Sequence, residues 1–278
     1  MNLGLLYRFL SEPCFIAEGY VSALLQMSME IQAAEHPRLK ELRQSVQPTM
    51  SVTPDGIAVV PIEGVMARNP QVWEMLFDGV EDTRNVQNML DTAATDPRVK
   101  GAVLAFDSPG GFITGGPEAA DSIAEMSKAK PTLAYTAGNM CSLASWMGSQ
   151  ADHVIASRSA QVGSIGAYTA VTDVSQYMAK YGVSVEVIKN AEAQYKAIGV
   201  PGTSLTADQR THLQDRIQSS FGGFRSDVLK ARPQIPADAM RGQVLSGMEA
   251  KSAGLIDGVG DMPYAMGVMR QMMRSRQS

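Results

Sequence analysis

Cysteine, histidine and aromatic residues are scarce in this chain. Of its 278 residues, two are cysteine and three are histidine, and aromatic residues make up 6%. Cys14 and Cys141 are too far apart in the sequence to form a zinc-binding CxxC pair, and the histidines form no HxxxH pair. We therefore expect neither a metal ion nor any other cofactor. The histidines are His36, His153 and His212.

Long apolar runs and an excess of one charge are also lacking. No run of about 18 apolar residues is present, and the first residues, interrupted by Arg8 and Glu12, lack the pattern of a secretory signal. The 24 basic and 28 acidic side chains leave a net charge of −4, with no basic cluster. This argues against nucleic acid or an anionic membrane as a partner. The sequence thus predicts a cytoplasmic protein with reduced thiols, no membrane anchor and no nucleic-acid partner.

The chain has the composition of a globular α/β protein. Hydrophobic residues make up 45% of it and charged residues 19%. Short β-branched segments alternate with helical segments, which predicts a mostly parallel sheet with flanking helices. The predicted strands are residues 57–62, 101–106, 131–137, 153–157 and 183–189. The predicted helices are residues 81–95, residues 116–128 and a segment that begins near residue 141.

The two flanks of this α/β region differ from it in pattern. Apolar residues at helical spacing predict an amphipathic helix over 13–34, followed by an irregular linker. After Leu205, Thr206 and Gln209 form a capping-box signature for a helix that ends near residue 231. Four methionines at helical spacing near the C-terminus predict a helix that packs or binds a partner. The expected division is an N-terminal helical appendage and linker over 1–55, an α/β domain over 56–261 and a Met/Arg-rich tail over 262–278.

A glycine-rich segment, DSPGG at residues 107–111, follows the predicted strand 101–106. Glycines at the carboxyl end of a parallel strand permit a sharp turn and leave backbone N–H groups facing a ligand. The segment matches neither the GxxxxGK[ST] nor the GxGxxG pattern, so phosphate binding is disfavoured. It predicts either a ligand-facing turn or an ordinary tight turn.

A second junction of this kind contains Ser142, within the segment 138–146 that follows the predicted strand 131–137. The start of a helix stabilises developing negative charge, which favours a nucleophile there. The alternative is helix capping, the commonest task of a serine at this place. Cys141, the preceding residue, is a competing nucleophile.

A nucleophilic serine requires a base, and the positions of the three histidines argue against a Ser-His-Asp triad. A lysine can serve when burial or a neighbouring charge lowers its pKa. Lys196 lies in AQYKAIG, a segment with no other charged residue. The alternative is a surface lysine whose stem covers apolar atoms.

In their order along the chain, these segments resemble the signal peptide peptidase A type of self-compartmentalising serine peptidases. That family includes the head maturation proteases of tailed phages, often called minor capsid protein C. The resemblance covers about residues 56–260. It depends on DSPGG at 107–111, the segment with Ser142 ten residues before Asp152, VGSIG at 162–166, YKAIG at 195–199 and GLIDGVG at 254–260.

The resemblance implies a role for each matching residue. Ser142 corresponds to the nucleophile, Lys196 to the general base, and Ser164 to the serine that orients the lysine. The spacing before YKAIG differs from that of the family by one or two residues, so Lys189 and Lys180 stay alternative bases, with Lys189 the stronger of the two.

The oxyanion hole implied by the resemblance is built from backbone N–H groups. They belong to Gly110 or Gly111 and to Leu143. The segment that follows Ser142, Leu143–Trp146, departs from the small or glycine-rich sequence usual in the family. The implied architecture is the Clp-protease/crotonase fold.

The function implied is that of a serine endopeptidase with a Ser-Lys dyad, assembled as a homo-oligomer. Its substrates would be polypeptides such as a capsid scaffold, a portal protein or its own termini, in the host cytoplasm or the phage prohead. Three alternatives stay open: a housekeeping protease of the signal-peptide-peptidase type, a crotonase-like acyl-CoA enzyme and an inactive structural capsid component.

Overall fold

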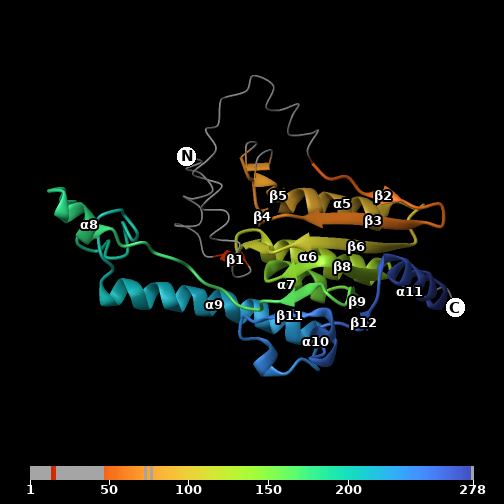
Figure 1. The fold of residues 1–278 in the computed structure, drawn as a ribbon. Coiled ribbons are helices and arrows are strands. Elements are labelled where there is room, and N and C mark those ends of the chain that lie inside the picture. The colour runs from red at the N-terminus through yellow and green to blue at the C-terminus, as the bar shows by residue number, and fades with distance from the viewer. Residues whose placement is uncertain (1–13, 17–46, 72–73, 76–77, 277–278) are drawn as a thin grey trace, which may run out of the picture.

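A computed structural model of the chain describes residues 14–16, 47–71, 74–75 and 78–276. Its centre is a sheet with helices on both faces, from which a long arm projects (Figure 1). Over the described residues, no helix combines the length and the apolar character needed to cross a bilayer.

The larger sheet has eight strands and is mainly parallel. They are β2 (Ser51–Val52), β3 (Ile57–Glu63), β6 (Gly101–Ser108), β8 (Thr132–Cys141), β9 (His153–Ala156), β10 (Gln161–Gly163), β11 (Val244–Ser246) and β12 (Gly258–Val259). The order β11-β10-β8-β6-β3-β2 forms the main path, and β9 joins β8 to β12. Only the pairs of β2 with β3 and of β10 with β11 are antiparallel. The predicted mostly parallel α/β architecture is confirmed.

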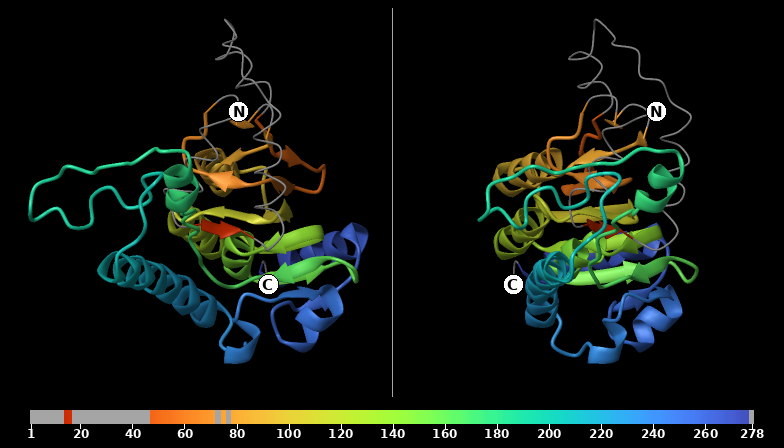
Figure 2. Two further views of the ribbon diagram at one scale, coloured as in Figure 1. Left: turned by 60° about the vertical axis from the view of Figure 1, so that its left-hand side comes forward. Right: turned by 90° about the vertical axis from the view of Figure 1, so that its left-hand side faces the viewer.

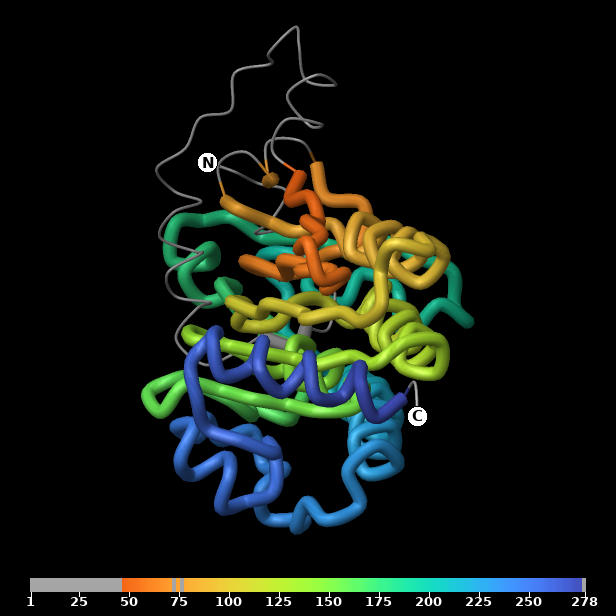
Figure 3. Tube along the Cα trace, turned by 90° about the vertical axis from the view of Figure 1, so that its right-hand side faces the viewer, coloured from red at the N-terminus to blue at the C-terminus, as the bar shows by residue number. Residues whose placement is uncertain are grey.

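Helices cover both faces of this sheet. On one face lie α5 (Thr83–Thr95), α6 (Gly116–Ala129) and α7 (Leu143–Ser149), whose residues Leu90, Ile123 and Met147 join the main core. The opposite face is covered by α11 (Met262–Ser275), with Met269 and Met273 buried in a second core (Figure 3). Successive residues of a strand point to opposite faces, so the apolar strands fill both cores.

A smaller sheet adjoins the larger one where β6 ends. It contains, in spatial order, β1 (Cys14–Ile16), β7 (Gly110–Phe112), β4 (Met66–Ala67) and β5 (Glu81–Asp82). β7 follows β6 after a single residue, Pro109, so the DSPGG segment connects the two sheets. β1 is antiparallel to β7, whereas β4 is parallel to both of its neighbours.

The arm, which we define as residues 167–205, leaves the core after β10 and contains α8 (Ser175–Lys180). It returns through α9 (Ala207–Ala231), which starts with the capping box between Thr206 and Gln209 that the sequence predicts. Figures 1 and 2 show the arm and the first turns of α9 projecting from the core. The chain then closes through the 3₁₀ turn η1 (Ala237–Ala239) and α10 (Gly247–Ser252) before α11.

Two sequence predictions differ from the structure. Residues 14–16 form a strand where a helix was expected; the rest of the predicted helix over 13–34 lies outside the described residues. Residues 183–189 form no strand, because the arm offers them no partner strand. The Met-rich segment forms the packed helix that the methionine spacing predicts: α11 covers one face of the sheet, and Met269 and Met273 are buried within the chain.

Glu81 is a buried carboxylic acid in the smaller sheet, with only 3% of its surface exposed. Burial raises its pKa to about 7, and the nearby Asp82 and Glu63 carboxylates add to the rise, while a 3.0 Å hydrogen bond from the Asn85 side-chain amide opposes it. The folded protein therefore holds this proton more tightly than the unfolded chain, in which a glutamate has its ordinary pKa of about 4.5. The contribution of Glu81 to the free energy of unfolding is fully present below pH 4.5 and is lost as the pH rises through about 7.

We expect Glu81→Gln to remove this loss, since glutamine keeps the acceptor for Asn85 and carries no charge. Relative to the wild type, the variant should gain up to about 3 kcal/mol in free energy of unfolding at pH 8 and little at pH 5. Urea unfolding at the two pH values measures the difference. The exposed Glu118 on α6 provides the matched control, Glu118→Gln, whose effect should be small at both pH values. An equal gain from Glu81→Gln at pH 5 and pH 8 would contradict the prediction.

Candidate active site

Ser142 lies at the junction between β8 and α7, in a backbone conformation that residues other than glycine rarely adopt. Its φ is 53° and its ψ is −117°, and its side chain makes no capping hydrogen bond to α7. The residue is 1% exposed, and among the described residues no hydrogen-bond partner reaches its Oγ. The capping role is thus excluded. Strained residues with an unsatisfied polar atom are typical of functional sites.

The serine three residues further on, Ser145, holds this turn in place. Its hydroxyl donates to the Met140 carbonyl and accepts the Gly163 N–H at 3.0 Å. The Gly163 carbonyl in turn accepts the Ser142 N–H at 2.7 Å. β8, β10 and the start of α7 are therefore tied together around the nucleophile position. Sequence reasoning assigned no role to Ser145, because the bonds that give it one join residues on separate strands.

The structure places Ser164 beside Ser142. Gly163 on β10 is paired with Cys141 on β8, so the two serines are the next residues on neighbouring parallel strands. Ser164 also has a positive φ of 52°, it is buried, and its N–H donates to the Gln243 carbonyl at 2.7 Å. Two strained, buried serines thus end adjacent strands at the same edge of the sheet.

The DSPGG segment borders the same place. Ser108 on β6 is paired with Met140, two residues before Ser142. Asp107 Oδ1 accepts hydrogen bonds from the Asn139 N–H at 3.0 Å and from the Asn139 side-chain amide at 3.1 Å. The segment is therefore hydrogen-bonded to β8 at a register shift, where β8 has more residues than β6. This irregularity sets the position of Ser142.

The two glycines of this segment are required by space and by backbone geometry. Gly110 has a φ of 109°, and a β-carbon at Gly111 would overlap the Met66 carbonyl. The Gly110 N–H donates to Ser108 Oγ at 3.2 Å, so Gly110 gives up or shares this bond if it is to bind an oxyanion. Leu143, the first residue of α7, has no acceptor for its N–H within the helix.

Cys141 and the described histidines do not fit the requirements of catalysis. Cys141 is fully buried, and burial raises the pKa of its thiol to about 12, which keeps it protonated and unreactive. His153 is paired with Leu133 at the start of β8, roughly 25 Å along the strand from Ser142. His212 stacks on Tyr195 in the first half of α9, with 4.2 Å between ring centroids. His36 lies outside the described residues.

Lys196 does not lie beside Ser142 within this chain. It is exposed in the arm, in a turn held to the first half of α9 by Gln194, whose carbonyl accepts the side-chain amide of Gln209 at 3.2 Å. The core contact of α9 is made by Phe224, which stacks on Trp146 of α7. His212, which the arm contacts, and Phe224 are separated by about 18 Å of helix.

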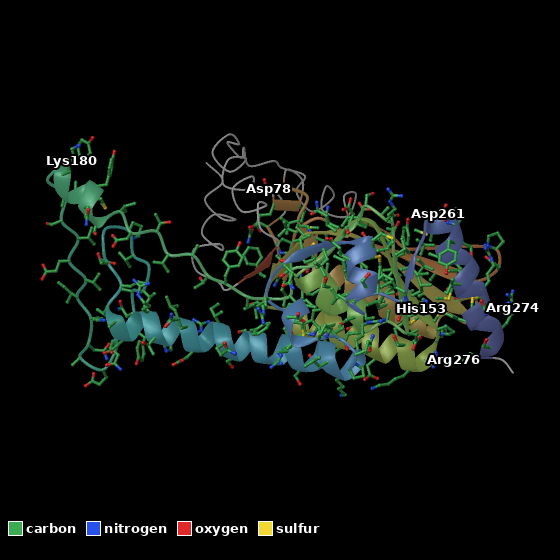
Figure 4. All side chains as sticks on the ribbon, turned by 60° about the horizontal axis from the view of Figure 1, so that its bottom comes forward. Asp78, His153, Lys180, Asp261, Arg274 and Arg276 are labelled. Atoms are coloured by element: carbon green, nitrogen blue, oxygen red, sulfur yellow. The ribbon has the colours of Figure 1, made fainter. Side chains whose placement is uncertain are left out.

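The two alternative bases lie in the arm as well. Lys189 and Lys180 are exposed, and Lys189 Nζ donates to the Gln194 carbonyl at 3.0 Å. Figure 4 shows Lys180 at the far end of the arm, well away from the core. The structure thus assembles Ser142, Ser164, Leu143 and the two glycines, and it leaves every candidate lysine outside the assembly. Within the described residues, no cluster of His, Cys, Asp and Glu suits a metal ion.

Known proteins with similar sequences include proteases and a phage head-tail preconnector protein. Capsid assembly protease C of Escherichia phage lambda is 30% identical over 81% of this chain and 51% of its own length. Head-tail preconnector protein GP5 of Enterobacteria phage P21 is 27% identical over 80% of this chain and 44% of its own length. Protease 4 of Salmonella typhi is 26% identical over 73% of this chain and 34% of its own length. The chain therefore spans about half of the length of such relatives, or less.

Solved structures with a related fold include an enoyl-CoA hydratase/isomerase family member, at 18% identity with a TM-score of 0.41 over 83% of this chain and 76% of that one. Another is the 1510-N stomatin-specific protease with a substrate peptide, at 11% identity with a TM-score of 0.44 over 74% and 75%. The sequence signature of peptidase family S49 matches residues 124–275, which include Ser142, Ser164 and Lys196. With more than half of its length matched by that signature, the chain belongs to peptidase family S49.

Proposed function

We propose that the chain is a serine endopeptidase in which Ser142 attacks the carbonyl of a peptide bond. The observation that carries this proposal is the Ser142 turn, which holds a buried hydroxyl without a hydrogen-bond partner among the described residues in strained backbone. The N–H of Leu143, with that of Gly110 or Gly111, would stabilise the tetrahedral oxyanion. Because these glycines belong to β7, an extended substrate would lie along that strand.

Lys196 is the proposed general base, and the proposed arrangement takes it from a neighbouring copy of the chain. A lysine deprotonates a serine only from within hydrogen-bond reach, and the arm holds Lys196 far from the Ser142 of its own chain. An arm that projects from the core can instead reach the core of a neighbour. Ser164, beside Ser142, would then orient the incoming lysine. Packing against the neighbour also removes water, as a neutral lysine requires.

The surface of the arm supports contact with a second copy. Among the described residues, ten large apolar side chains are notably exposed, and seven of them lie in the arm. Val183, Val185 and Val187 alternate as in a strand, and Ile188 is 91% exposed. Such a surface is unfavourable in water, and an unpaired strand-like segment is completed by a partner strand. A homo-oligomer joined through the arms would satisfy both requirements. The seven side chains are Tyr177, Tyr181, Val183, Val185, Val187, Ile188 and Tyr195.

The proposed substrates are polypeptides of phage head assembly, such as a scaffold or portal protein, within the host cytoplasm or the prohead. The two phage relatives, named for capsid assembly and for the head-tail preconnector, support this choice. A housekeeping role like that of a signal peptide peptidase is the second candidate, supported by the similarity to protease 4.

Labelling with a serine-directed fluorescent phosphonate tests the proposed function. We expect the full chain to gain the mass of one phosphonyl group on Ser142 and to cleave unfolded casein. Ser142→Ala should lose labelling and cleavage together. Cys141→Ala is the matched control, because its neighbouring hydroxyl is intact and its labelling should persist. A crotonase-like enzyme or an inactive capsid component would show neither labelling nor cleavage, and that result would refute the proposal.

A further inference from the structure

The strand β1 lies on the side of β7 to which a substrate would bind. β1 is antiparallel to β7, with Cys14 opposite Phe112, Phe15 opposite Gly111 and Ile16 opposite Gly110. The smaller sheet ends at β1, so without it β7 would be an edge strand with free backbone groups. A second strand cannot pair with the same side of β7 while β1 is present.

β1 runs toward the proposed catalytic edge. Because β1 is antiparallel to β7, its carboxyl end lies opposite Gly110, near one of the two possible glycine donors of the oxyanion hole. Gly110 follows Ser108, which is paired with Met140 just before Ser142. Ile16 therefore ends β1 beside the glycine that leads back to this edge.

The nucleophile is closed off in this arrangement. Ser142 is 1% exposed, whereas a substrate carbonyl has to come within contact distance of its Oγ. In this structure β7 is paired with β1, and the proposed nucleophile Ser142 is buried. A substrate therefore has to displace β1 and gain access to Ser142 Oγ before it can react.

We infer that residues 14–16 inhibit the enzyme by occupying the place of the substrate strand on β7 in their own chain. The inference rests on the proposed function, since it takes Ser142 and β7 as the catalytic edge. β1 pairs with β7 over only three residues, so a substrate strand that also contacts Ser142 and the oxyanion donors can displace it. If β1 occupies the edge nine-tenths of the time, the apparent affinity for a substrate strand falls about tenfold.

A binding experiment that needs no catalysis tests this inference. The probe is a fluorescein-labelled synthetic peptide with the sequence of residues 10–19, LSEPCFIAEG, titrated into the full chain carrying Ser142→Ala. Successive N–H groups of a strand face opposite sides, so Phe15→Pro with Ile16→Pro removes at least one N–H that faces β7. We expect this variant to bind the probe about tenfold more tightly. The control, Phe15→Val with Ile16→Val, keeps both N–H groups and strand propensity and should leave the affinity near its starting value.

Equal affinities for the proline and valine variants would overturn the inference, provided that both unfold at the same urea concentration as their parent. With Ser142 intact, the proline variant should also cleave unfolded casein with a lower KM and an unchanged kcat, as relief of competition requires. Tighter probe binding without any cleavage would reject the proposed function and leave the pairing of β1 supported. Cleavage that is independent of the proline pair would reject the inhibition and leave the proposed function supported.

Discussion

Ser142→Ala is expected to lower the kcat/KM for peptide cleavage by about four to six orders of magnitude, because loss of the nucleophile removes the covalent pathway altogether. The fold should be unaffected. Ser142 Oγ has no hydrogen-bond partner among the described residues, so its removal breaks no bond there, and alanine has the same β-carbon in the same strained backbone. We therefore expect a change in the free energy of unfolding below about 1 kcal/mol.

Two measurements on the same preparations check this prediction: cleavage of unfolded casein and urea unfolding. Cys141→Ala, one residue away and equally buried, is the control for local disturbance and should keep most of the activity. An active Ser142→Ala together with an inactive Cys141→Ala would assign the nucleophile to the cysteine. An inactive but destabilised Ser142→Ala would show that the hydroxyl has a structural task that the structure does not indicate.

A mixture of two inactive variants is expected to regain activity. Ser142→Ala retains its lysine and Lys196→Ala retains its serine, so a site that takes the two residues from different copies can combine the intact ones. If subunits mix at random in equal amounts, about a quarter of the sites contain both residues. The physical basis is the distance along α9 that separates the arm contacts of Lys196 from the core contacts at Phe224.

The mixture is prepared by co-expressing the two chains with different affinity tags and purifying through both tags in turn. Casein cleavage by the doubly purified protein is compared with that of each variant alone. Lys189→Ala is the matched lysine control, since it lies in the same arm and is exposed; alone, it should retain most of its activity. If the doubly purified protein does not cleave casein although both variants are folded and co-purified, the serine and the base belong to one chain. The arm would then have to move to bring Lys196 to Ser142.

The sequence by itself determines much of the local structure of the core and supplies the candidate site residues. Apolar, β-branched segments of five to eight residues favour buried strands, and the periodic segments between them favour helices that cover the sheet, so the sequence predicts the parallel α/β architecture. The helix over 207–231 follows from Thr206 and Gln209, whose capping bonds both form. DSPGG and the Ser142 segment are likewise recognisable, because sharp turns after strands require particular residues at fixed spacing.

Only the tertiary structure decides which of these residues meet. Ser142 and Ser164 come together because β10 pairs with the end of β8, and the long-range hydrogen bonds of Ser145 hold that pairing. The predicted strand over 183–189 is absent, and residues 14–16, the described part of a predicted helix, form a strand. Both outcomes have one reason, which is that a strand depends on its partner. Residues 183–189 have none within the chain, while residues 14–16 find one in β7. Lys196 shows the same limit, because the sequence pattern selects this lysine as a candidate base and only the tertiary structure shows that the arm holds it away from the Ser142 of its own chain.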